Sequence, residues 1–170
     1  MNDDDIAHFK SILGTEGMLT DEEELHIYNN DWTGHYEGKS KLVLKPGSSK
    51  EVSDIASICN QEECPIVAWG TGTSLEGNAL AKRGGISINM MNMNKILQVN
   101  SEDMDVVIQP GVTREDLNSF IKDKGLFLLF KIPRDPELII YVALDAPKEP
   151  PPKITFVLAS FSGTPTSMEI

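Results

Sequence analysis

The chain has 170 residues and a formal net charge of −11 at pH 7, with 40% hydrophobic and 24% charged residues. This composition is typical of a globular protein with a hydrophobic core, and it excludes a disordered chain. No apolar run reaches the ~20 residues that span a bilayer, and the acidity disfavours nucleic acid or anionic lipid as a partner, because both require basic patches.

Two helices are predicted in the first part of the chain. Apolar residues recur on one face of residues 3–13, and aspartates occupy the first turn. Thr20 stands three residues before Glu23, which is an N-cap signature, so a second helix is expected to begin there. Residues 28–40 are rich in Asn, Asp and Gly and are expected to form a loop with a turn anchored by the packing of Trp32. The alternative is that this part of the loop borders an active site.

A β-α-β unit is predicted next. A short β-run over residues 41–45 is closed by Pro46, and a helical pattern over 49–61 follows. Ser48 or Ser49 can cap that helix. Residues 65–69 are apolar on both faces, as in buried parallel strands, and run directly into a glycine-rich turn.

The remainder alternates strand and helix patterns. Thr113 is expected to cap a helix that Gly125 ends. The alternation predicts an α+β (α/β-like) fold, with a small mixed sheet flanked by helices. Beyond Phe127 the chain holds seven of its ten prolines, and a Pro-Pro-Pro run separates two possible strands. The β-runs of this part, including those two, are residues 84–90, 95–99, 104–111, 138–144 and 154–161.

The glycine-rich turn has the chemistry of an anion site. Glycine adopts positive φ and lets a ligand approach the backbone, and consecutive N–H groups in such a turn form a concave site for anions. The hydroxyls of Thr and Ser add donors, so no Lys or Arg is required. The turn matches neither the Walker loop nor G-x-G-x-x-G, and a plain tight turn between strands is the alternative. The residues concerned are Gly70, Thr71, Gly72, Thr73, Ser74 and Leu75.

Residues 28–60, 65–97 and 99–127 resemble consecutive stretches of one family, and the resemblance covers about residues 9–127. That family is the PCMH-type FAD-binding domain of the vanillyl-alcohol oxidase/p-cresol methylhydroxylase superfamily. The most similar branch contains D-lactate dehydrogenase (cytochrome), the glycolate oxidase subunit and D-2-hydroxyglutarate dehydrogenase. The strand ending in Pro46, the G-T-G-T-S-L loop and the Q-P-G-V turn occur in the family's order and spacing.

The resemblance implies FAD as cofactor and the first lobe of a two-lobed FAD-binding domain. It implies that residues 70–75 bind the FAD diphosphate and that Pro46 lines the cofactor site. Pro110, Gly111 and Val112 would add a backbone contact. Such enzymes oxidise a 2-hydroxy acid by hydride transfer to the flavin, whose electrons pass to a cytochrome or quinone.

The sequence departs from the family near residue 128, where a second lobe and a substrate domain would follow. We therefore expect residues 1–40 to form N-terminal helices and a loop, 41–127 the FAD-binding lobe, and 128–170 a divergent proline-rich tail. This interpretation makes the chain a truncated or fused gene product, inactive alone and without an identifiable catalytic residue. It would bind FAD, and a small 2-hydroxy acid only if the missing half is supplied. The alternative is a non-catalytic lobe that acts through self-association or a companion subunit.

The remaining residues carry simpler expectations. The acidic start MNDDDIAHFK lacks the basic pattern of secretory and mitochondrial leaders, so a cytoplasmic location is expected. The two cysteines, Cys59 and Cys64, are predicted to be free thiols, and no metal site is predicted. Lys82 and Arg83 are expected in an exposed turn rather than at a phosphate. The three histidines are expected at the surface or in turns, because no metal-ligand spacing joins them.

Overall fold

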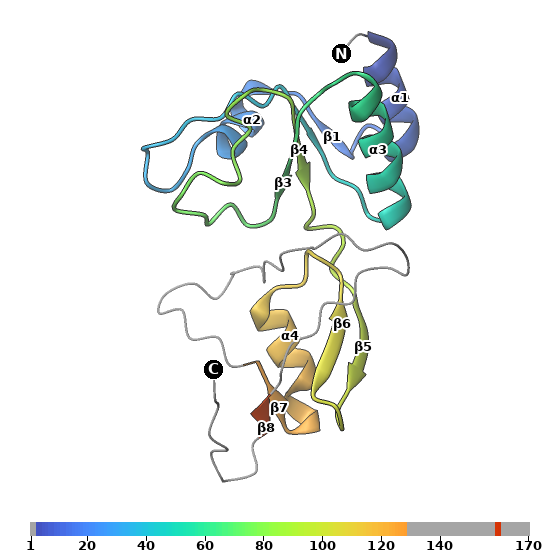
Figure 1. The fold of residues 1–170 in the computed structure, drawn as a ribbon, viewed down its shortest axis with the longest axis vertical. Coiled ribbons are helices and arrows are strands. Elements are labelled where there is room, and N and C mark those ends of the chain that lie inside the picture. Colours follow the sequence, from blue (N-terminus) through green and yellow to red (C-terminus); the bar gives the residue numbers. More distant parts are fainter. Residues whose placement is uncertain (1–2, 129–158, 161–170) are drawn as a thin grey trace. The chain divides into compact units, whose positions relative to one another are not determined.

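The structure is a computed structural model that describes residues 3–128 and 159–160. The chain divides into two compact units, Met1–Asn94 and Lys95–Ile170, which are described separately (Figure 1).

The first unit is built on a four-stranded mixed sheet in the order β1-β2-β4-β3. The strand β1 is antiparallel to β2, whereas β4 lies parallel to both β2 and β3. Parallel neighbours joined by a helix are the product of β-α-β connections, and the predicted unit of this kind is present. The strands are β1 (Met18–Leu19), β2 (Leu42–Leu44), β3 (Ile66–Trp69) and β4 (Ile86–Asn89).

Two helices cover one face of this sheet, α1 (Asp3–Leu13) and α3 (Ser49–Gln61) (Figure 1). The hydroxyl of Ser48 accepts a hydrogen bond from the Glu51 N–H at 3.3 Å, so Ser48 is the cap of α3. Apolar side chains of both helices and of β2 and β4 form one core, which buries most of the strands' apolar surface on this side. Its buried members are Phe9, Leu42, Leu44, Ile55, Ile58, Cys59, Ile86 and Ile88.

The other face is covered by α2 (Glu22–Asn29) and by the segment that follows β3. Asp21, not Thr20, is the N-cap of α2, because its carboxylate accepts from the N–H groups of Glu23 and Glu24. This second core holds Leu25, Tyr28, Val43, Trp69, Ala79 and Leu80.

The strand β3 differs from expectation. It is an edge strand, and it leaves Ile66 43% exposed and Ala68 exposed as well. An apolar run looks the same in a buried strand and in an edge strand, so the sequence pattern does not predict the edge position of β3. Trp69, at the end of the strand, is 6% exposed and belongs to the second core.

The second unit contains an antiparallel pair, β5 (Ile96–Asn100) and β6 (Asp105–Ile108), together with α4 (Arg114–Ile121). As predicted, Thr113 caps α4, and it does so in a reciprocal capping box with Asp116. A 3-10 turn, Lys122–Lys124, leads to Gly125, whose φ of 69° ends the helical segment. The buried core of this unit comprises Val106, Ile108, Val112, Leu117, Ile121, Leu126 and Leu128.

The α+β fold with a small mixed sheet and flanking helices is thus confirmed. Of the possible tail strands, residues 138–144 lie outside the described residues, whereas Ala159–Ser160 form β8 and pair with β7 (Leu126–Phe127). The three-part division of the chain stays a prediction. In the described part of the chain, no helix is both long and apolar enough to cross a membrane.

Candidate functional site

The candidate site is the segment that leaves β3, residues 70–78, which we call the glycine loop. The carbonyl of Trp69 accepts the last ladder hydrogen bond, from the Met90 N–H at 2.9 Å. Beyond it, within residues 3–128, no hydrogen bond engages the N–H groups of residues 70–75. The loop therefore keeps a consecutive run of backbone donors outside the sheet.

Gly72 sets the path of the first half of the loop. Its φ is +74°, a region that side-chain-bearing residues rarely adopt. A Cβ at this position would lie 2.1 Å from Cζ2 of Trp69, so the backbone rests directly on the indole. Both observations require glycine, and the positive φ at this position is as predicted, whereas the close approach of a ligand to the backbone stays a prediction.

The indole of Trp69 is itself held from α2 and β4. Its ring centroid lies 4.8 Å from that of Tyr28, at an interplanar angle of 52°. The hydroxyl of Tyr28 accepts a hydrogen bond from Nδ2 of Asn89 at 2.7 Å. Asn89 in turn accepts from the Met91 N–H at 2.8 Å, which fixes its side chain.

The second half of the loop makes an internal turn. The hydroxyl of Ser74 lies 3.4 Å from the N–H groups of both Glu76 and Asn78, which donate to it. Gly77 has a φ of +64°, and a Cβ there would lie 2.9 Å from the ring of Tyr36.

Hydroxyl groups line the same segment. Those of Thr71 and Thr73 lie 3.4 Å apart, and both side chains are half-buried. Leu75 is 66% exposed. Backbone N–H groups without partners and small hydroxyls are the donor set that phosphate oxygens accept from. The residues present therefore fit the diphosphate of a dinucleotide, and they do so without a cation in residues 70–75.

The other residues predicted to contact the cofactor, Pro46 and residues 110–112, lie outside the glycine loop. Pro46 is less than 2% exposed. Pro110, Gly111 and Val112 belong to the second unit, where the Val112 N–H donates to the Gln109 carbonyl at 3.1 Å and the Val112 side chain is 1% exposed. Their part in cofactor binding stays a prediction.

The turn at residues 31–36 corrects another expectation. Trp32 is 78% exposed and does not anchor the turn. Asp31 does, because its carboxylate accepts hydrogen bonds from the Thr33 hydroxyl and from the Tyr36 N–H. The Thr33 hydroxyl lowers the pKa of Asp31 against the opposing effect of burial, and backbone N–H groups add to the lowering.

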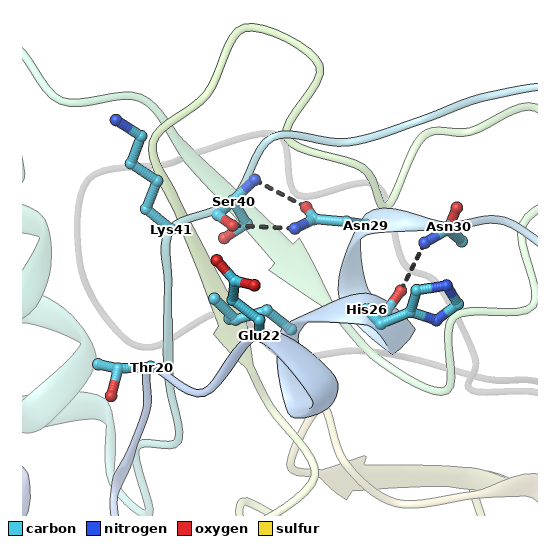
Figure 2. A pocket seen from close by; sticks show the side chains of 8 residues that line it. Thr20, Glu22, His26, Asn29, Asn30, Ser40 and Lys41 are labelled. Atoms are coloured by element: carbon cyan, nitrogen blue, oxygen red, sulfur yellow. Dashed lines mark hydrogen bonds between the residues drawn. The ribbon is translucent and has the colours of Figure 1, made fainter.

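A pocket of about 550 Å³ lies beside α2 and was not predicted (Figure 2). Figure 2 shows the Asn29 amide paired with the backbone of Ser40, and the Asn30 amide donating to the His26 carbonyl. These bonds tie both amides to the backbone. None of the predicted site residues lines this pocket, whose lining is Thr20, Glu22, Leu25, His26, Asn29, Asn30, Ser40 and Lys41.

Both cysteines are free, as predicted, with Cys59 buried and Cys64 half-buried. Burial, together with the neighbouring Cys64, raises the pKa of the Cys59 thiol to about 11. Among the described residues, no three acidic, His or Cys side chains gather as metal ligands. The three histidines, His8, His26 and His35, are exposed, as expected.

The first unit is thus an α+β lobe with a glycine-rich loop after its edge strand β3. The family described as FAD binding domain matches residues 40–137, more than half of the chain. The chain belongs to this FAD-binding family, and FAD is the cofactor that the family binds.

Curated relatives agree with this assignment. The chain is 35% identical over 128 residues to a probable D-2-hydroxyglutarate dehydrogenase of Oryza sativa subsp. indica. It is 36% identical over 122 residues to a probable D-lactate dehydrogenase of Danio rerio. These alignments cover 75% and 72% of the chain but only 23% and 24% of the relatives. The chain therefore spans about a quarter of the length of the curated relatives it matches.

Solved structures show the same fold. p-Cresol methylhydroxylase matches 78% of the chain with a TM-score of 0.65 at 22% identity, over 28% of its own length. An alkyldihydroxyacetonephosphate synthase matches 75% of the chain with a TM-score of 0.65 at 21% identity, over 26% of its own length. The predicted resemblance in fold to p-cresol methylhydroxylase is confirmed.

The expected cytoplasmic location is wrong. Relatives from rice, zebrafish, Arabidopsis thaliana and Schizosaccharomyces pombe carry names that place them in mitochondria. The expectation relied on the acidic first residues alone, and the lack of a leader pattern there is weak evidence about where a protein acts.

Proposed function

We propose that the chain binds the diphosphate of FAD through the main-chain N–H groups of residues 70–75, as part of an FAD-linked oxidoreductase of the D-2-hydroxy-acid dehydrogenase type. The observation that carries this proposal is the run of loop donors without partners above the Trp69 indole. Pro46 and the turn of Pro110, Gly111 and Val112 are proposed as further cofactor contacts.

The chain's own residues would bind and orient the cofactor. The N–H groups of Thr71 to Ser74 have no hydrogen-bond partner in the described residues, and we propose that they donate together to the phosphate oxygens. The hydroxyls of Thr71 and Thr73 add two donors that can rotate toward the ligand. When bound, FAD supplies the redox chemistry of the reaction.

The substrate class is inferred from the relatives. The relatives are named D-lactate dehydrogenase, D-2-hydroxyglutarate dehydrogenase and glycolate oxidase subunit. All three names concern 2-hydroxy acids, so we propose a 2-hydroxy acid as the substrate of the complete enzyme. The described residues offer no group that we would assign to proton abstraction, and we expect the chain alone to be inactive.

Titration calorimetry with three flavins tests the proposal. FAD contains a diphosphate, FMN one phosphate and riboflavin none, so recognition through the loop predicts affinities that fall in that order. Equal affinity for FAD and riboflavin would contradict diphosphate recognition, and no heat with FAD would reject cofactor binding by this chain.

Self-association or a companion subunit is the second proposal, and one observation favours it. The edge strand β3 leaves Ile66 43% exposed, and Leu75 beyond it is 66% exposed. Unpaired strand edges with apolar side chains are surfaces on which chains associate. Size-exclusion chromatography with light scattering tests this, and a monomer at high concentration would argue against it.

A further inference from the structure

We propose that Tyr28 and Tyr36 are positioning residues that hold the glycine loop in its anion-binding conformation. Both tyrosines precede residues 40–137, the stretch that the FAD-binding family matches. The inference rests on the proposed function, because it concerns the same loop. It adds that a segment outside the family match, residues 22–38, prepares the loop for its ligand.

The loop requires support from elsewhere, because its own backbone provides little. The N–H groups of residues 70–75 make no hydrogen bond within the described part of the chain, and β3, which precedes them, is an edge strand. The internal bonds of the loop are made by side chains, between the Thr71 and Thr73 hydroxyls and from the Glu76 and Asn78 N–H groups to the Ser74 hydroxyl. A site made of free backbone donors binds well only if those donors are already oriented, since ordering them on binding lowers the affinity.

Tyr28 supports the first left-handed glycine of the loop through one intermediate. The Tyr28 ring packs on Trp69 with centroids 4.8 Å apart, and the indole fills the space that a Cβ of Gly72 would occupy. Asn89 donates to the Tyr28 hydroxyl at 2.7 Å and so fixes the ring from the central strand β4. The chain of contacts runs from α2 to the backbone of Gly72.

Tyr36 supports the second left-handed glycine directly. The Cβ position of Gly77 lies 2.9 Å from Cγ and 3.0 Å from Cβ of Tyr36, so backbone and ring are in close contact. Tyr36 is held on one side by its N–H bond to Asp31 at 3.2 Å. On the other side the Lys82 ammonium lies 4.0 Å from the ring centroid, a cation–π contact. Lys82 is exposed, as expected, yet it has this structural partner.

Tyr36 directly, and Tyr28 through Trp69, therefore support the loop at the two positions where its backbone is most constrained. Gly72 and Gly77 are the residues with positive φ in the loop, at +74° and +64°. Fixing both leaves the intervening segment, residues 73–76, little freedom to rearrange. This arrangement gives the two residues a role in cofactor affinity without any contact with the cofactor.

Hydrogen–deuterium exchange of the full chain without FAD tests the role of Tyr36. Tyr36→Ala removes the ring, and we expect the amides of Glu76 and Asn78, which donate to the Ser74 hydroxyl, to exchange about three- to tenfold faster, which corresponds to one lost aromatic contact. Tyr36→Phe keeps the ring and should exchange like wild type. Trp32→Ala is the matched control, because Trp32 lies in the same turn as Tyr36, residues 31–36, and is 78% exposed. Peptides of β2 and β4 should be unchanged in all three variants.

Two results would overturn the role of Tyr36. One is wild-type exchange of the glycine loop in Tyr36→Ala. The other is faster exchange throughout the first unit, which would indicate a merely structural residue. Tyr36→Leu, which retains apolar bulk, should give an intermediate rate, and a fully wild-type rate for it would reject the need for a ring.

Tryptophan fluorescence tests Tyr28. In a Trp32→Phe background, Trp69 is the single tryptophan, because the chain has two. Adding Tyr28→Phe removes the bond to Asn89 and should increase collisional quenching of Trp69 by acrylamide while weakening FAD binding about threefold. Unchanged quenching and affinity would reject the inference for Tyr28. If wild type fails to bind FAD, the proposed function fails, whereas exchange and quenching still decide the inference.

Discussion

Two turns of the molecule follow a strand and contain glycine, and the family resemblance assigns both to the cofactor. In the glycine loop, the N–H groups of residues 70–75 have no hydrogen-bond partner within the described residues. In the turn of Gln109 to Thr113, the Val112 N–H is bonded to Gln109 and the Val112 side chain is buried. The first turn leaves its backbone donors without partners in the described residues, whereas the second uses the Val112 N–H within its own fold.

The comparison shows that two glycine-containing turns can differ in how many backbone donors they leave without a partner. What distinguishes the first turn is its support by side chains from distant segments, Trp69, Tyr28 and Tyr36, which leaves the backbone groups unbonded. The second turn is stabilised by its own backbone bond and by an apolar side chain in the core. Substitutions in the two turns should therefore have different effects.

The largest effect is expected for Gly72→Ala. The new Cβ would overlap the Trp69 ring, 2.1 Å away, and φ of +74° adds backbone strain. We expect the affinity for FAD to fall about 10- to 100-fold, because strain of this kind costs about 1–3 kcal/mol. Calorimetric titration measures it.

The control for this variant is Gly34→Ala. Gly34 lies in the same unit with a φ of +67°, and nothing lies within 4 Å of its Cβ position. It carries the strain without the overlap and lies outside the glycine loop, so its FAD affinity should stay near wild type. Equal losses in both variants would show that general destabilisation, and not the loop, controls binding.

A smaller effect is expected when the two loop hydroxyls are removed. The double variant Thr71→Val and Thr73→Val keeps the shape of both side chains but loses two donors that lie 3.4 Å apart. We expect the FAD affinity to fall about five- to tenfold, since hydrogen bonds to charged groups contribute about 1.5–3 kcal/mol when buried and less at a half-buried site. The double serine variant restores the hydroxyls and should restore the affinity; failure to do so would assign the loss to packing.

Val112→Ala should separate stability from binding. Val112 is 1% exposed in the core of the second unit, so its truncation should lower the free energy of unfolding by about 2 kcal/mol. The FAD affinity should change by less than about twofold, because a change of that size is within the usual spread of small substitutions. Val107→Ala, at a half-buried position of β6, is the control for stability. A tenfold loss of affinity in Val112→Ala would remove the contrast between the two turns.

The smallest effect is expected from pH, through Asp31. Its pKa is lowered in the folded protein, so its contribution to stability is complete above the unfolded value of about 3.9 and is lost as pH falls through the folded value. Urea unfolding should show wild type more stable than Asp31→Asn at pH 7, with the difference shrinking below about pH 4. A constant difference across this range would contradict the assigned role of Asp31.

Features encoded by neighbouring residues were predicted well. The cap by Thr113, the cap by either Ser48 or Ser49 and the helix end at Gly125 depend on residues three or four apart, and the structure confirms them, with Ser48 as the cap of α3. The predicted cap by Thr20 is wrong by one residue, because Asp21 caps α2. The β-α-β unit followed from periodicity in the same way. Features that depend on distant residues were not predicted. The edge position of β3 depends on which strands lie beside it, and the exposure of Trp32 depends on Asp31 organising the turn instead.

In the candidate site, too, features that depend on adjacent residues were predictable and features that depend on distant residues were not. The donor-rich loop was predictable because glycine and hydroxyl residues are adjacent in the sequence. Its support was not, since the bond between Asn89 and Tyr28 joins residues 61 positions apart. A pair of tyrosines in an Asn-rich segment gives no signal of this role, and only the contacts with Trp69 and Gly77 reveal it.

The absence of Lys and Arg from residues 70–75 has a consequence for how the chain responds to its medium. Contacts between fixed charges weaken steeply as ions are added, because the Debye length shrinks from about 10 Å at 0.1 M to about 3 Å at 1 M. Amide dipoles at contact distance are screened far less. A chain with a net charge of −11 would even gain from added electrolyte, since its long-range repulsion of a dinucleotide diminishes. The affinity of the loop for a dinucleotide should therefore stay constant or rise at high salt concentration, whereas the affinity of a pocket lined by lysines would fall.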